Sequence, residues 1–250
     1  MNIIVCVKRV PATDSKIKIA PSGVAIDPTG VEYVLNPYDE FAVEEALKLK
    51  EAAGAGSVTV VTLGSSEAQK MLRDVLAMGA DKAVLLRDGG VAHDGYSTAE
   101  CLAAWIKTQP FDAIFTGKQA VDSDNSQLGP RLAALLDLPC VSEIVKLTVE
   151  GRTFIAERDI EGAREVVRGS LPAVLTAQKG LNQPRYANLK GIMAAKKKPL
   201  EEIDAAAIAP ATEVASLSLP PERPPGRILG EGAAAVGKLI EVLRNEAKVL

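Results

Sequence analysis

The chain of 250 residues is 47% hydrophobic and 24% charged, the composition of a soluble globular protein with enough apolar material for a sizeable core. Its formal net charge of −3 gives the molecule as a whole no electrostatic reason to bind nucleic acid or an anionic membrane. The three cysteines (Cys6, Cys101 and Cys140) are too scattered for a disulfide framework or a zinc site, and no targeting or membrane-spanning segment is recognised, so a cytoplasmic protein is expected.

Short β-branched runs alternate with segments of helical periodicity through the first half of the chain. Strands are predicted over residues 2–8, 57–63, 82–86 and 112–116. Helical periodicity follows each of them, over residues 37–53, 68–76, 101–106 and 128–136. Asn36 and Pro37 are expected to be the N-cap and the first residue of the first helix. The alternation predicts an α/β fold with an open, mainly parallel sheet and flanking helices.

The second half of the chain has a different pattern. Short strands joined by turns, over residues 140–149, 152–158 and 165–168, indicate a small antiparallel extension of the sheet. The segment that begins at Gln183 is too polar for the sheet and is expected to lie outside the core. Beyond it, an Ala- and Pro-rich stretch predicts an extended arm, and the last helix has an apolar face that must dock on another surface. The expected units are a domain over residues 1–182, a segment over 183–200, and an arm with a helix over 201–250.

The stretch from Gly117 to Pro130 is the most informative part of the sequence. It begins at the carboxyl end of a predicted strand and leads into a helix, which is where open α/β sheets bind ligands and where free helix N–H groups attract phosphate. Asn125 and Ser126 are expected to cap this helix. The acidic side chains of the stretch would oppose a phosphate unless they turn toward other donors. On position and composition alone, a capped loop with solvated acids is an equally good interpretation.

The sequence contains few patterns that indicate catalysis. Lys118 is not followed by Ser or Thr as in a Walker motif, and no Gly-rich fingerprint follows a strand, which disfavours a P-loop ATPase or a standard Rossmann dehydrogenase. The only histidine, His93, stands in a Gly-rich loop and is expected to have a structural or solvent role. Cys6 in the first strand is expected to be a small core residue and not a nucleophile.

A second informative region runs from Arg185 to Lys198. Apolar side chains stand next to a run of three lysines, a mixture that suits an adaptable protein-binding surface. An amphipathic helix packed on its own domain explains the same pattern and is slightly preferred from the residues alone. The apolar members are Tyr186, Leu189, Ile192 and Met193.

Several motifs in the same order closely resemble the electron-transfer flavoprotein beta family over most of residues 1–200. They include Val7-Lys8-Arg9-Val10-Pro11, Asn36-Pro37-Tyr38-Asp39-Glu40, Leu76-Ala77-Met78-Gly79-Ala80-Asp81, Gly117 to Asp122, Leu171-Pro172-Ala173-Val174 and Pro184-Arg185-Tyr186-Ala187. The run Ile192 to Lys198 also matches.

The resemblance implies an adenine nucleotide alpha hydrolase-like fold and a heterodimer whose alpha subunit holds most of an FAD, while this subunit buries an AMP. Thr13 and Tyr38 match positions that approach the isoalloxazine ring, and Arg158 and Asp159 match positions that influence the flavin domain. The residues that correspond to the family's AMP site are Cys6, Asn36, Pro37, Tyr38, Asp39, Leu63, Gly117, Lys118, Gln119, Ala120, Val121, Asp122, Ser123, Asp124, Asn125, Ser126, Gln127 and Leu128.

The resemblance also implies partners and a non-enzymatic role. Leu189 matches the anchor of a recognition loop that docks on acyl-CoA dehydrogenases and related proteins, with Tyr186, Ile192 and Met193 around it, so docking displaces the packed-helix interpretation. Electrons would pass from a dehydrogenase to the FAD and then to a membrane-associated electron-transfer flavoprotein quinone oxidoreductase, and this chain would make no substrate bond.

Some positions differ from the family pattern. Ala12 replaces a common Asp, Leu128 a common Thr, and Lys190-Gly191 a common Pro-Asn. Bifurcating members, which bind a second FAD in place of AMP, usually have Gly-Asp-Thr where this chain has Ser123-Asp124-Asn125, so AMP is favoured. Two hypotheses from other classes are an ATP-hydrolysing α/β protein, which would need a catalytic metal or phosphate clamp, and a stand-alone nucleotide sensor.

Overall fold

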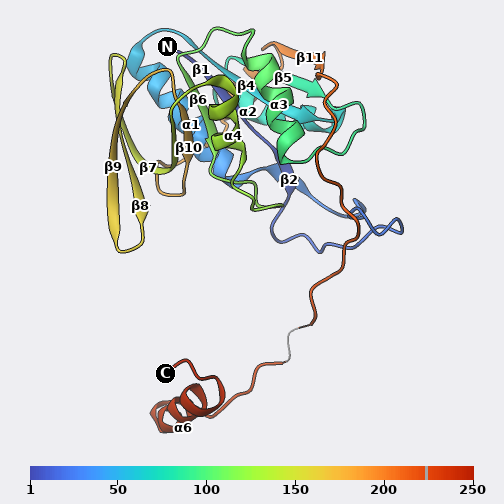
Figure 1. The fold of residues 1–250 in the computed structure, drawn as a ribbon, viewed down its shortest axis with the longest axis vertical. Coiled ribbons are helices and arrows are strands. Elements are labelled where there is room, and N and C mark those ends of the chain that lie inside the picture. The colour runs from blue at the N-terminus through green and yellow to red at the C-terminus, as the bar shows by residue number, and fades with distance from the viewer. Residues whose placement is uncertain (223–224) are drawn as a thin grey trace.

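The computed structural model describes residues 1–222 and 225–250, and its main body is a sheet with helices on both faces (Figure 1). Within the described residues, nine strands form one sheet in the order β11-β5-β4-β1-β6-β10-β7-β8-β9. The strands from β11 to β7 run parallel, whereas β8 and β9 are antiparallel to their neighbours. The strands are β1 (Asn2–Cys6), β4 (Ser57–Gly64), β5 (Lys82–Arg87), β6 (Ala113–Gly117), β7 (Cys140–Glu150), β8 (Thr153–Ile160), β9 (Ala163–Ser170), β10 (Val174–Ala177) and β11 (Leu200–Asp204). The predicted open, mainly parallel sheet with a small antiparallel extension is confirmed.

The alternation of side chains along β1 shows how the core divides into two layers. Ile3 and Val5 pack toward one face of the sheet, whereas Ile4 and Cys6 pack toward the other. Helices α1 (Pro37–Ala53) and α2 (Gln69–Met78) cover the first face, and α3 (Gly95–Ile106) and α4 (Leu128–Leu136) cover the second. The buried thiol of Cys6 confirms the expected core position, and burial raises its pKa above the ordinary range.

Four smaller elements lie around this body. A 3-10 turn, Ser66–Ala68, leads into α2, and the short helix α5 (Leu189–Ala195) packs against α2. The strands β2 (Arg9–Pro11) and β3 (Tyr33–Leu35) form a separate antiparallel pair.

The edge strand β11 corrects one expectation. The segment after Gln183 was expected to stay outside the sheet, yet Leu200–Asp204 pairs with β5 along five residue positions. Its side chains are mostly exposed, so the strand is stabilised by the backbone ladder and by ion pairs, Lys82 with Glu201 at 2.8 Å and Arg87 with Asp204 at 2.7 Å. An edge strand of this kind has no apolar periodicity that a sequence pattern could reveal.

The residues after β11 form an extended arm. The thiol of Cys101 donates a hydrogen bond to the carbonyl of Ala206 at 3.3 Å, and the amide of Leu217 donates to the carbonyl of Gly23 at 2.7 Å. The arm ends in a 3-10 turn (Ala233–Ala235), α6 (Val236–Glu241) and a π-helical turn (Val242–Glu246), which Figure 1 shows apart from the sheet. The apolar side chains of α6 are exposed. No helix in the described part of the chain has the length and apolar character needed to cross a membrane.

Candidate functional site

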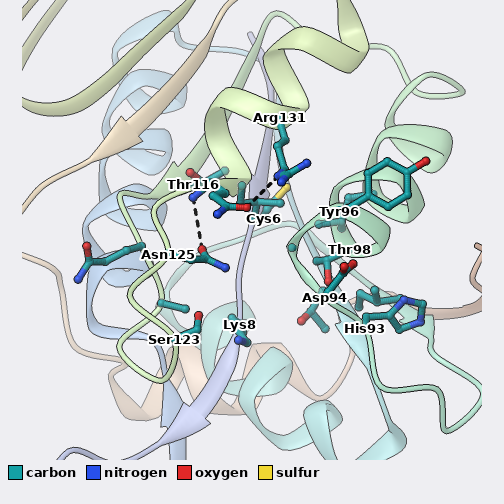
Figure 2. Close-up of a pocket in the computed structure, with 18 of the residues that line it drawn as sticks. Cys6, Lys8, His93, Asp94, Tyr96, Thr98, Thr116, Ser123, Asn125 and Arg131 are labelled. Atoms are coloured by element: carbon teal, nitrogen blue, oxygen red, sulfur yellow. Dashed lines mark hydrogen bonds between the residues drawn. The ribbon is translucent and has the colours of Figure 1, made fainter. Parts of the chain in front are cut away.

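A cavity of about 850 Å³ opens at the carboxyl ends of β1, β4 and β6 (Figure 2). Its volume lies in the range of small-molecule sites, and its position is where open parallel sheets bind ligands. In Figure 2, Ser123 and Asn125 stand on one side of the cavity, and Thr98, Asp94 and His93 stand on the other. The cavity is therefore built from two loops that face each other across the strand ends.

Asp39 joins the strand ends beneath the cavity. Its buried carboxylate accepts hydrogen bonds from the amide of Lys8 at 2.7 Å, the amide of Gly117 at 3.0 Å and the side chain of Asn36 at 2.9 Å. Burial raises the pKa of Asp39 to about 7, although these three donors act in the opposite direction. A Cβ at Gly117 would overlap the Asp39 carboxylate and Tyr38, so only glycine permits this close approach.

Asn36 links the start of α1 to the cavity loop. It occupies the N-cap position, but its side chain makes no capping hydrogen bond to the helix, contrary to expectation. Its amide nitrogen donates to the carbonyl of Gln119 at 2.8 Å, and its oxygen accepts from the amide of Val121 at 3.2 Å. Since both partners belong to the loop after β6, Asn36 holds that loop in place.

The acidic side chains of the loop after β6 are bound by other protein groups, so they do not face the place where an anion would bind. Asp122 pairs with the Lys8 ammonium at 2.7 Å, and Asp124 accepts a hydrogen bond from Gln119 at 2.6 Å. Asp124 and Ser126 have φ values of 49° and 51°, a left-handed conformation that is strained for these residues. The strained turn places the Ser126 hydroxyl 2.9 Å from the side-chain oxygen of Gln119.

The N-terminus of α4 is free of a side-chain cap. Gln127 is the N-cap residue and makes no capping hydrogen bond, so the prediction that Asn125 and Ser126 cap this helix is wrong. Asn125 instead accepts a hydrogen bond from the amide of Gln127 at 3.3 Å, and Arg131 donates to the Gln127 side chain at 3.0 Å (Figure 2). An uncapped helix start next to a guanidinium group is a favourable environment for an anionic group.

The opposite wall follows β5 and includes residues that sequence reasoning did not select. His93, expected to have a structural or solvent role, lines the cavity, and its Nδ1 lies 3.0 Å from the hydroxyl of Ser97. Asp94 caps α3 by accepting from the amide of Ser97 at 2.8 Å. Its other oxygen accepts from the amides of Ala211 and Thr212, both at 2.9 Å, and from the Thr212 hydroxyl at 3.0 Å.

These hydrogen bonds to Asp94 bring the arm to the cavity, whose lining includes Ala211 and Thr212. The pKa of Asp94 lies well below its usual range, and the largest cause is the hydrogen bond that its carboxylate accepts from the backbone amide of Ser97. The contact between the arm and Asp94 joins residues more than a hundred positions apart, so no local pattern could have predicted it.

The structure brings most of the predicted nucleotide residues to this one cavity. Those that line it are Cys6, Asn36, Asp39, Leu63, Gly117, Lys118, Gln119, Ala120, Ser123, Asn125, Gln127 and Leu128. Pro37, Tyr38, Val121, Asp122, Asp124 and Ser126 are not part of this lining. Tyr38 stands next to it, since the ammonium of Lys118 lies 5.4 Å from the centroid of the Tyr38 ring.

Three predicted residues lie away from the cavity. Thr13 is exposed in the loop between β2 and β3. Arg158 and Asp159 lie on β8, where they form ion pairs with Glu165 and Arg164 at 2.7 and 2.8 Å. A flavin-facing position for Thr13 and an influence of Arg158 and Asp159 on the flavin domain stay predictions.

The segment before and within α5 combines a firm anchor with exposed apolar side chains. Arg185 pairs with the buried Glu44 at 2.8 Å and with the exposed Glu51 at 2.6 Å. Beyond this anchor the exposed fractions are 96% for Tyr186, 75% for Leu189, 65% for Met193 and 47% for Ile192. Apolar side chains that a helix leaves in solvent next to one another indicate a surface for a protein partner.

Comparison with known proteins connects this geometry to a family. A family model described as the electron transfer flavoprotein domain matches residues 24–208. The chain belongs to the electron-transfer flavoprotein beta family. It is 45% identical to the electron transfer flavoprotein subunit beta of Bacillus subtilis, over the full length of both chains. The beta subunit of Bradyrhizobium diazoefficiens is 38% identical over the full length of both chains, and that of Mus musculus is 38% identical over 98% of each chain.

Proposed function

We propose that this chain is the AMP-binding, partner-docking subunit of a heterodimeric electron-transfer flavoprotein, and that the cavity after β6 holds the AMP. The observation that carries this proposal is the convergence of an uncapped helix N-terminus, Arg131 and the strained loop after β6 on one cavity at the strand ends. An adenylate has an anionic phosphate and hydrogen-bonding ribose and base groups, and the lining supplies an apolar part around Leu63 and Leu128 next to these donors.

The residues of this chain fit an adenylate better than a catalytic role. Asp122 pairs with Lys8 and Asp124 accepts a hydrogen bond from Gln119, and neither of these two acids is part of the cavity lining. Within the described residues, no three His, Cys, Asp or Glu side chains gather as they would around a metal ion. In this proposal the chain contributes binding and orientation, while an FAD held mainly by an alpha subunit supplies the redox chemistry.

The exposed apolar residues of α5 and Tyr186 form the docking surface in this proposal. The surface would receive an acyl-CoA dehydrogenase or a related enzyme as electron donor, and an electron-transfer flavoprotein quinone oxidoreductase would accept the electrons. The clamp of Arg185 on α1 fixes the base of this surface, and the exposed side chains beyond it are free to adapt to more than one partner.

Cofactor extraction tests the first part of the proposal. The chain is co-expressed with its alpha subunit, the heterodimer is purified and denatured, and the released nucleotides are quantified. One FAD and one AMP per heterodimer is the expected result. Two FAD and no AMP would assign the cavity to a second flavin, as in bifurcating members, and the absence of any adenylate beyond a single FAD would refute the nucleotide site.

Electron transfer from a dehydrogenase tests the docking surface. Leu189→Ala removes apolar contact from the most exposed large apolar residue of α5 and should slow flavin reduction by an acyl-CoA dehydrogenase with an unchanged FAD content. Leu189→Met keeps a comparable apolar volume and serves as the matched control. If the two variants reduce at the same rate as the wild type, Leu189 is not part of a docking surface.

A further inference from the structure

A second groove, of about 640 Å³, lies beside the exposed surface of α5 and is distinct from the nucleotide cavity. Strand β3, helix α2 and the segment Pro184–Ala187 form its walls. Its floor includes apolar side chains, among them Leu35, Met71 and Met78. The groove thus offers both apolar contact and a set of charged groups.

The two arginines of the groove are already neutralised by other side chains. Arg9 pairs with Glu67 at 2.9 Å and lies over the ring of Tyr33, 3.7 Å from its centroid. Arg185 pairs with Glu44 and with Glu51, two acids that lie outside the groove lining. Neither arginine is therefore available to balance the remaining acids of the groove.

Three acids of the groove, Glu32, Glu40 and Asp74, have carboxylates that neither accept a hydrogen bond nor form an ion pair with a side chain in the described part of the chain. Lys70 also lines the groove and stands one helical turn before Asp74. Desolvation raises the pKa of Glu40 and of Asp74, and the Lys70 ammonium offsets only part of the rise for Asp74. A cationic group entering the groove would remove this penalty.

The groove and the α5 surface are continuous. Tyr186 belongs to the groove wall, and it is 96% exposed at the start of the segment that leads to Leu189 and Met193. A protein that rests on these apolar residues therefore also covers the mouth of the groove. Interfaces of this kind combine an apolar centre with charge complementarity at the edge.

We propose that the groove receives a lysine or arginine side chain of the electron-donating dehydrogenase that docks on α5. The apolar floor contacts the aliphatic part of that side chain, and Glu40 and Asp74 pair with its charge. This inference rests on the proposed docking function of α5 and adds an electrostatic anchor beside its apolar one.

The test uses the intact heterodimer and an acyl-CoA dehydrogenase reduced by its acyl-CoA. The variant Glu40→Gln/Asp74→Asn keeps the side-chain shapes and removes two negative charges. The KM of the dehydrogenase for the heterodimer should rise about threefold to tenfold, with kcat and FAD content unchanged. This KM should also increase less steeply with ionic strength than it does for the wild type. Glu40→Lys should raise the KM further because it places a like charge at the site. Glu150→Gln removes an exposed charge on β7, away from the groove, and is the matched control.

The outcomes separate this inference from the docking function. A raised KM in Leu189→Ala together with wild-type kinetics in the double variant would overturn the electrostatic anchor and leave the docking surface standing. Wild-type kinetics in both variants would overturn the docking surface and the anchor together. Glu40 lies in the first turn of α1, so thermal unfolding is followed in parallel. Asp74→Asn alone, in the middle of α2, gives a second measurement if the double variant is unstable.

Discussion

Protonation of Asp39 gives the cavity a measurable pH signature. Burial raises the pKa of Asp39 from 3.8 to about 7 in the folded protein. A raised folded-state pKa means that the native chain binds the proton more tightly than the unfolded chain. The resulting stabilisation is complete below pH 4 and is lost as the pH rises through 7.

Asp39→Asn removes this dependence, because the amide stays neutral. Between pH 5 and pH 8 the wild type should lose about 2 to 3 kcal/mol of unfolding free energy relative to the variant, since one pH unit corresponds to about 1.4 kcal/mol. Above pH 8 the difference should be constant. The comparison uses the difference between two curves, so any constant cost of the substitution cancels.

Urea unfolding of the full-length chain at several pH values, followed by circular dichroism, provides the measurement. Glu150→Gln is the control, because this exposed carboxylate at the end of β7 lies away from the cavity. Curves for wild type and Asp39→Asn that run parallel from pH 5 to pH 8 would refute the reasoning. The amides of Lys8 and Gly117 would then hold Asp39 ionised throughout this range.

Three other substitutions have defined consequences. Gly117→Ala should reduce the AMP that co-purifies with the heterodimer at least tenfold, whereas Gly64→Ala, which meets no atom within 4 Å, should leave it unchanged. Arg185→Met leaves the buried Glu44 without its cation, and chemical denaturation should show a loss of about 2 kcal/mol of unfolding free energy. Asp94→Ala detaches the arm from the cavity wall, and AMP should dissociate faster in a dilution assay, with an unchanged rate arguing against a role of the arm in retention.

The βα units could be predicted because their signals are local. Apolar spacing of 3.6 residues marks α1 and α2, and the turn at Gly54, where φ is 69°, ends α1 where the glycine pattern placed it. β11 lacked such a signal, since its side chains are exposed and its partners lie on β5. Periodicity therefore identified the buried elements and missed the edge.

The cavity could be predicted in its position but not in its internal contacts. The rule that ligands bind at strand ends pointed to the loop after β6. The same rule applied to β5 would have selected the loop with His93 and Asp94, whose Gly-rich composition instead suggested a solvent-exposed turn. Asn36 and Asn125 are of a residue type that commonly caps helices. A long-range hydrogen bond gives Asn36 another partner, and the strained backbone beside Asn125 does the same for that side chain.

The two proposed sites differ in the physical reason for their placement. The cavity depends on backbone groups fixed by the sheet, because Asp39 holds the ends of β1 and β6 and Asn36 holds the loop that follows. The α5 surface depends on side chains that the sheet does not bury, and its position comes from the Arg185 clamp on α1. Helix α1 carries Asp39 in its first turn. It also carries Glu44 and, two turns later, Glu51, the two acids that pair with Arg185. This one helix therefore positions both sites. A single helix as the common base keeps the proposed nucleotide site and the proposed docking surface at a fixed relative position.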